Sequence, residues 1–170
     1  MKAVTPAMTA GLRSVDLIDG DLRLTLNNTI AAIEDGRVRI AAYLEPLGLD
    51  ALILNRVEVV FEEVISNIVR HGFAKGADHT ILVRVARRQD SLDFTFEDDG
   101  TPFNPLEAPK PEPLRSIETA QLGGLGISLV RKMSASVRYE PIARGEVRRD
   151  LGGRVFEPHN RLMLSIAAPV

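Results

Sequence analysis

The amino-acid sequence predicts an α+β fold, a two-layer α/β sandwich in which helices cover one face of a mixed, mostly antiparallel sheet. Apolar and polar residues alternate over residues 22–26, 81–86 and 92–97, which is typical of half-buried strands. The last two runs are separated only by a short polar turn, which favours a hairpin. Residues 51–71 instead repeat apolar side chains every three or four positions, which indicates an amphipathic helix.

Length and composition favour one globular unit. The chain has 170 residues, of which 45% are hydrophobic, so we expect an N-terminal arm over residues 1–20 and a single domain over residues 21–170. The formal net charge of −2 gives no reason to expect nucleic acid as a partner. The absence of cysteine excludes disulfides and thiolate metal sites. Without an apolar signal core or a membrane-spanning run, we expect a cytoplasmic protein that contacts no membrane.

Two helices are expected in the first half of the domain. Thr29 and the two asparagines before it offer N-cap chemistry for a helix over residues 28–44. Asp50 can cap the second helix, over residues 51–71. Gly72 lies just past its end, where a left-handed residue is often needed.

The second half contains a long irregular segment. Residues 101–122 hold five of the ten prolines, and structureless loops of this length are often functional lids. A helix is expected over residues 126–134, and closing strands over residues 136–139 and 161–167. Between these strands, the charged residues 144–154 are expected to form an exposed hairpin tip or an insertion.

The helix over residues 51–71 carries a polar stripe. Glu63, Asn67 and His71 follow one another at intervals of four residues and border the apolar face. Polar groups at the margin of a core cost free energy unless they find partners, so this stripe is a candidate site. The alternative is that Glu63 is solvated and His71 caps the last turn. Glu62 points further toward solvent and is the weaker of the two glutamates.

The strand over residues 92–97 ends in a second candidate group. The alternation places Asp98 on the apolar face of the strand, where the carboxylate needs hydrogen-bond donors. The exocyclic amine of a purine is one such donor, and Gly100 allows the backbone to approach closely. The alternative is an ordinary Asp-Asp-Gly turn.

A third candidate is the glycine-rich start of the helix near residue 126. Glycines before a helix expose backbone N–H groups that suit phosphate, and residues 123–126 are Gly-Gly-Leu-Gly. The alternative is a flexible loop. No strand immediately precedes these glycines, so they are not a dinucleotide fingerprint, and no phosphate-loop signature follows them.

Together, in this order, the three segments resemble the GHKL, or Bergerat-fold, ATP-binding domain. Residues 63–73 resemble the N box of the anti-sigma-factor serine/threonine kinases especially closely, and residues 98–100 match the first glycine box. Residues 124–127 match the second glycine box. The resemblance extends over about residues 20–167.

The resemblance implies a role for each matching residue. Glu63 would be the general base acting on a serine or threonine hydroxyl, Asn67 would ligate Mg²⁺, and Asp98 would accept from the adenine amine. The segment 101–122 would be the ATP lid. The remaining nucleotide-binding positions implied are His71, Gly100, Gly124, Leu125, Gly126 and Ile127.

The function implied is an ATP-dependent serine/threonine protein kinase that regulates a sigma factor by partner switching. Its partners would be an antagonist protein as substrate and a sigma factor, and its N-terminal region would form a homodimer. Two alternatives stay open: a non-catalytic ATP-binding module that only holds a partner, and an ATPase that couples hydrolysis to conformational change. The chain departs from the family at residues 142–158, which expand a short turn, and at Asn160, which stands where a threonine is usual.

Overall fold

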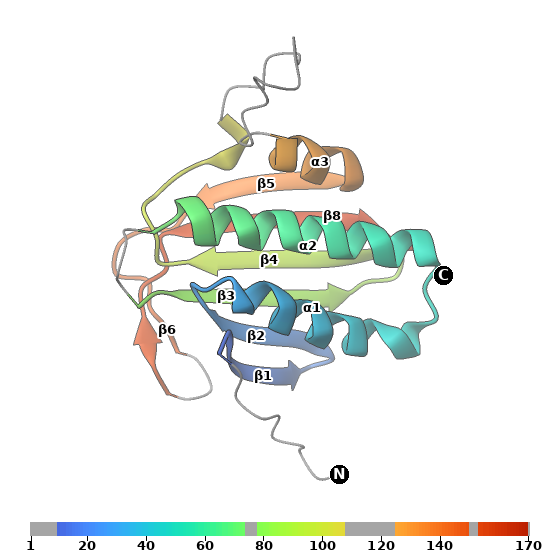
Figure 1. Ribbon diagram of the computed structural model, residues 1–170, viewed down its shortest axis with the longest axis horizontal. Coiled ribbons are helices and arrows are strands. Elements are labelled where there is room, and N and C mark those ends of the chain that lie inside the picture. The colour runs from blue at the N-terminus through green and yellow to red at the C-terminus, as the bar shows by residue number, and fades with distance from the viewer. Residues whose placement is uncertain (1–9, 74–77, 108–124, 150–152, 170) are drawn as a thin grey trace.

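The computed structural model describes residues 10–73, 78–107, 125–149 and 153–169. A six-stranded sheet forms one layer, and three helices cover one of its faces (Figure 1). The elements are β1 (Leu12–Ile18), β2 (Asp21–Asn27), α1 (Ala31–Leu44), η1 (Glu45–Leu47), α2 (Ala51–His71), β3 (Thr80–Arg87), β4 (Ser91–Asp98), η2 (Pro105–Glu107), α3 (Leu125–Met133), β5 (Ser136–Pro141), β6 (Arg148–Arg149), β7 (Val155–Phe156) and β8 (Asn160–Ala167).

The strand order in the large sheet is β1-β2-β3-β4-β8-β5, and each neighbouring pair is antiparallel. The two-layer α+β architecture predicted from the sequence is therefore confirmed. The predicted hairpin corresponds to β3 and β4, in which Val83 pairs with Phe96. No helix in the described part of the chain is long and apolar enough to cross a membrane.

The first strand corrects the expectation of an irregular arm over residues 1–20. Leu12–Ile18 forms β1 and pairs with β2, so the arm prediction is wrong for this segment. The register shifts between Leu12 and Ser14, and Leu17 is 66% exposed on this edge strand. The bulge interrupts the alternation of inward- and outward-facing side chains, which is why the sequence pattern did not reveal a strand. Residues 1–9 lie outside the described residues.

The core lies between the sheet and the helices. Aligned residues of four strands form one apolar row across the sheet: Leu24, Val83, Phe96 and Leu162. From α2, Phe61 and Val64 are each 1% exposed and belong to the same cluster. Burying one such side chain contributes about 1.5–3 kcal/mol, so this row and the α2 face hold the two layers together.

The helix ends differ partly from the predictions. Asp50 caps α2 as expected, because its Oδ1 accepts from Leu52 N at 2.6 Å. By contrast, α1 begins at Ala31 and has no side-chain cap, because its N-cap residue is Ile30, whose apolar side chain cannot accept a hydrogen bond. Gly72 has φ −76°, so the expectation of a left-handed cap is wrong.

The insertion before β8 folds against the uncovered face of the sheet. Its strands β6 and β7 form a small hairpin, as expected for this stretch. Arg148 donates from Nε to Glu97 Oε2 at 2.9 Å, and Arg161 donates from Nε to Glu97 Oε1 at 2.7 Å. Glu97, the penultimate residue of β4, is only 8% exposed. The two guanidinium groups compensate the charge of this buried carboxylate.

Candidate functional site

A small cavity lies where the C-terminal half of α2 faces the end of β4 and the start of β8. It has a volume of about 40 Å³. Four predicted site residues line it together: Asn67, His71, Asp98 and Ile127. Pockets that hold drug-sized ligands are larger, about 300–1,000 Å³, so a nucleotide requires the walls to separate. Phe103, which is 52% exposed, and the adjoining Thr101 form one such wall.

Two residues of the polar stripe of α2, Asn67 and His71, line this cavity, whereas Glu63 does not. Glu63 and Asn67 are half-buried and lie one helical turn apart, and His71 is exposed at the end of the helix. The side chains of Glu63 and Asn67 make no hydrogen bond to any other described residue. A carboxylate and an amide oxygen are therefore available to a ligand on the same face of α2.

The first turn of α3 approaches the stripe. Gly126 faces the carboxylate of Glu63 so closely that a side chain at residue 126 would collide with it. Ile127 lines the cavity. Leu125 begins the helix, and Gly124 lies outside the described residues, as does the part of the expected lid over residues 108–122. The beginning of that segment, over residues 101–107, contains the short helix η2.

Asp98 lies on the buried face of β4, as the alternation predicts, and is 5% exposed. Its Oδ1 accepts from Gly100 N and from Asn160 Nδ2, each at 2.9 Å. Burial raises the pKa of the Asp98 carboxyl, while these two hydrogen bonds oppose the rise. Both described hydrogen bonds reach Oδ1, so Oδ2 is the oxygen with which Asp98 can receive a donor from a ligand.

Gly100 closes the turn behind Asp98. A Cβ at this position would lie 2.3 Å from the carbonyl oxygen of Gly72, so only glycine lets the end of β4 pass the end of α2. The Gly100 carbonyl accepts from Nδ1 of His159 at 2.9 Å. The chain therefore bends at Gly100, directly after β4, and Asp98 at the end of that strand lines the cavity.

Tyr139 and Asn160 are among the cavity residues that were not predicted as site residues, and their side chains are hydrogen-bonded to each other. Tyr139 lies on β5 and donates to Asn160 Oδ1 at 2.8 Å, while Asn160 is the direct β8 partner of Asp98. Sequence reasoning noted Asn160 only as a departure from a family pattern. Asn160 and Asp98 are hydrogen-bonded but lie 62 positions apart in the sequence, so only the register of β4 with β8 reveals the pair.

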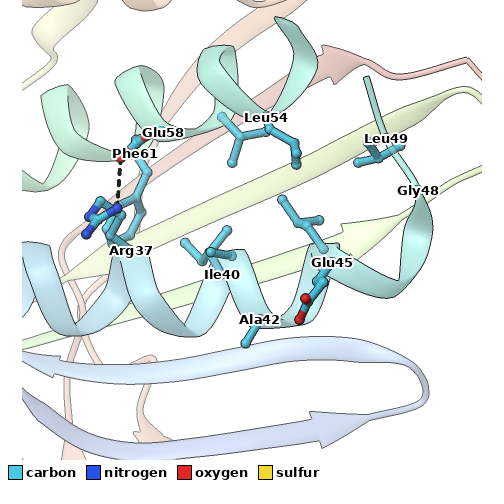
Figure 2. Close-up of a pocket in the computed structure, with 12 residues that line it drawn as sticks. Arg37, Ile40, Ala42, Glu45, Gly48, Leu49, Leu54, Glu58 and Phe61 are labelled. Carbon is cyan, nitrogen blue, oxygen red and sulfur yellow. Dashed lines mark hydrogen bonds and ion pairs between the residues drawn. The ribbon is translucent and has the colours of Figure 1, made fainter. Parts of the chain in front are cut away.

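A larger cavity of about 540 Å³ lies between α1 and α2, away from the predicted site residues (Figure 2). Its walls are mainly aliphatic, and Arg37 crosses one end to reach Glu58 at 3.0 Å. None of the residues that line it is a predicted site residue. Four of the predicted site residues instead line the smaller cavity at the ends of α2 and β4.

With this geometry established, comparison with known proteins identifies the family. Residues 26–148 match the model of the histidine kinase-like ATPase domain, and the chain belongs to this family.

Among curated proteins, the chain is 29% identical over 79 residues to the serine/threonine-protein kinase BtrW of Bordetella bronchiseptica, covering 46% of this chain and 56% of BtrW. It is also 29% identical over 108 residues to the serine-protein kinase RsbW of Listeria monocytogenes, covering 61% and 68% of the two chains. The similarity to the anti-sigma F factor of Oceanobacillus iheyensis is 20% over 101 residues, covering 59% and 69%.

A solved structure with the same fold contains the RsbU and RsbW domains of Rv1364c from Mycobacterium tuberculosis. It aligns with a TM-score of 0.55 at 17% identity, covering 87% of this chain and 32% of that one. At this identity the likeness establishes the fold alone. The match to BtrW likewise spans little more than half of that relative's length, 56%.

The residues present fit a magnesium nucleotide. The amide oxygen of Asn67 is the kind of hard oxygen ligand that Mg²⁺ accepts together with phosphate oxygens. Gly100 and Gly126 each lie where a Cβ would collide with a neighbouring group, so backbone lies close to both ends of the site. Asp98 supplies a buried acceptor for a base.

Proposed function

We propose that the chain is an ATP-binding serine/threonine protein kinase that acts as an anti-sigma-type regulator by partner switching. The observation that carries this proposal is the pairing of Glu63 and Asn67, which are half-buried, one turn apart and next to Gly126. A non-catalytic binding module has no need for a carboxylate at this position. The names of the similar proteins, which include two serine or serine/threonine kinases and an anti-sigma factor, support the same class.

In the proposed site, each group has one task. Asp98 accepts a hydrogen bond from the adenine amine, and Asn67 ligates Mg²⁺, which when bound neutralises phosphate charge. The other nucleotide-binding positions proposed are His71, Gly100, Gly124, Leu125, Gly126 and Ile127. Phosphoryl transfer depends mainly on positioning and charge stabilisation, so this small set of groups suffices.

Glu63 is proposed as the general base. A serine or threonine hydroxyl of the substrate protein forms the new bond to the γ-phosphorus as the bond to the ADP oxygen breaks. The hydroxyl proton passes to the Glu63 carboxylate. Glu63 can perform this step because it is half-buried, its carboxylate lies beside Gly126, and it is not hydrogen-bonded to another described residue.

The proposed protein partners are an antagonist protein as phosphoryl acceptor and a sigma factor. The experiment that tests the function incubates the full chain with γ-labelled ATP, Mg²⁺ and candidate antagonist proteins, and follows label on serine or threonine. Transfer of label to one candidate supports the kinase. Calorimetry without any ATP or ADP binding by the folded chain would reject nucleotide binding itself, whereas binding without transfer would favour the non-catalytic module.

A further inference from the structure

A separate cleft lies on the face of the sheet that the helices leave uncovered. It has a volume of about 440 Å³, which is within the range of sites for drug-sized ligands. Residues of β1, β2, β3, β4 and β8 form its floor, and the insertion contributes β6 as a further wall. None of the residues that line it is a predicted site residue, so this cleft is distinct from the proposed nucleotide site.

Arginine is the most frequent charged residue in this cleft. Two carboxylates line it, Asp16 and Glu97. The five arginines that line it are Arg23, Arg84, Arg148, Arg149 and Arg161. A cleft in which one sign of charge predominates raises the local concentration of ligands of the opposite sign. Anions are therefore the ligands that this cleft favours.

Three of the five arginines are compensated by carboxylates of the protein itself. Arg148 and Arg161 both bind Glu97, and each also approaches one further carboxylate. Arg84 donates from Nε to Asp21 Oδ2 at 2.8 Å. These three side chains are therefore held in place by internal ion pairs and form fixed walls of the cleft.

The other two arginines, Arg23 and Arg149, have no carboxylate partner among the described residues. Arg23 is exposed on β2, where its register partners are Asp16, with which it forms no ion pair, and Arg84. Like charges directly opposite each other on a sheet face destabilise it, so an anion beside Arg23 and Arg84 relieves a repulsion. Arg149 donates to the uncharged carbonyl of Gly153 at 3.0 Å. Two positive charges are thus available to a ligand.

The cleft also offers apolar contacts. Ile18, Leu82 and Met163 line it and are only half-buried, because no helix covers this face of the sheet. Partly exposed apolar side chains between charged groups suit the hydrocarbon body of an organic ligand, which leaves water on binding.

We propose that this cleft binds a small organic dianion that bridges Arg23 on the sheet and Arg149 on the insertion. Each anionic end is a phosphate or a carboxylate, because a guanidinium group pairs with two oxygens of either in one plane. The body of the ligand lies against the apolar side chains of the cleft. A stable protein partner would bury a much larger surface than this cleft offers. Because Arg149 belongs to the insertion over residues 142–158, the site depends on that expanded turn.

The test is calorimetric titration of the full chain, with and without saturating ADP. The probes are suberate and the bisphosphonate with the same hexamethylene body, each compared with its monoanionic counterpart, heptanoate or hexylphosphonate. At least one dianion should bind about tenfold more tightly than its monoanionic counterpart, because a second charge-assisted contact contributes about this factor. The tighter of the two dianions identifies the anionic group as carboxylate or phosphate.

Three variants test the bridge. Arg23→Gln and Arg149→Gln each remove one charge from an exposed side chain, so both should fold, and each should abolish the preference for the dianion. Arg138→Gln is the matched control. Arg138 is 74% exposed on β5, beside Met163 on the same face of the sheet, but does not line the cleft. Its loss should leave the preference unchanged.

The remaining outcomes would overturn the inference. They are wild-type protein that prefers neither dianion, and a preference that persists in both Arg23→Gln and Arg149→Gln. Loss of dianion binding in the presence of ADP, or in Asp98→Asn, would place the ligand in the nucleotide cavity instead. Binding of a hexaglutamate peptide without binding of either dianion would replace the small ligand with a protein segment. Dianion binding by a chain that does not bind ADP would support this site while rejecting the proposed nucleotide site.

Discussion

A Cβ added to Gly126 would lie 2.2 Å from Oε2 of Glu63, and 3.2 Å from its Cδ. The first turn of α3 therefore abuts the carboxylate that is proposed to act as the base. Real Cβ atoms do not approach an oxygen this closely, so Glu63 keeps its position only while residue 126 is glycine.

The first prediction follows from this contact. Gly126→Ala should displace the Glu63 carboxylate and lower phosphoryl transfer by about a hundredfold, since a misplacement of 1 Å can cost that much. ADP binding, measured by calorimetry, should change less. Leu129→Ala, on the exposed side of the same helix, is the control and should transfer at the wild-type rate. A wild-type rate for Gly126→Ala would mean that Glu63 does not need this position.

The second prediction concerns the two adjacent glutamates. Glu63→Ala should reduce transfer by 10²-fold or more while ADP binding stays within a few-fold of wild type, because a base acts on the transition state. Glu62 is exposed, and Glu62→Ala is the matched control with wild-type transfer expected. Single-turnover transfer from labelled ATP measures both. Loss of transfer in Glu62→Ala alone would identify Glu62 as the base instead.

The third prediction uses the raised pKa of Asp98. Recognition of an amine requires the carboxylate, so ADP affinity should be constant at high pH and fall as pH decreases through the raised pKa. Stability has the opposite sign, because an acid with a raised folded-state pKa binds more protons when folded and destabilises the fold as pH rises. Asp98→Asn should therefore weaken ADP binding but leave the melting temperature at pH 7 equal or higher. A lower melting temperature would contradict this.

The fourth prediction concerns the contact between α1 and α2. A Cβ at Gly36 would lie 2.3 Å from Cζ of Phe61, a ring that is 1% exposed and 6.4 Å from the ring of Phe96. Gly36→Ala should destabilise the fold by about 1–3 kcal/mol through overpacking, measured by urea unfolding. Adding Phe61→Leu should recover part of this loss, because the smaller side chain leaves room. Additive effects of the two changes would show that the residues do not interact.

The fifth prediction concerns assembly. Ile30 and Val38 are 60% and 48% exposed near and on α1, which supports the proposed homodimer through the N-terminal region. Light scattering at micromolar concentration should give about twice the chain mass of 18.6 kDa. Val38→Asp should give the monomer mass, while Arg56→Asp on α2 should not. A wild-type monomer would reject the dimer without affecting the kinase proposal.

The sequence predicted elements whose evidence is local. The buried position of Asp98 follows from the alternation of apolar and polar side chains along β4. The extent of α2 follows from the spacing of its apolar residues and from the N-cap residue Asp50. What could not be predicted depends on contacts between distant segments. The bulge hid β1, and the pairing of Asp98 with Asn160 exists only through the register of two strands. The approach of Gly126 to Glu63 likewise requires the packing of two helices.

Glu97 and Asp98 are neighbours in sequence but face opposite sides of the sheet, and each finds its donors only on its own side. A slip of β4 by one residue would exchange them. Asp98 would then lie on the face of Arg148 and Arg161, Glu97 would lie on the core face, and the phenylalanines of the strand would turn away from the helices. The donors on the two faces of the sheet therefore favour one register of β4, because a misaligned strand loses the hydrogen bonds that the native register makes to Glu97 and Asp98.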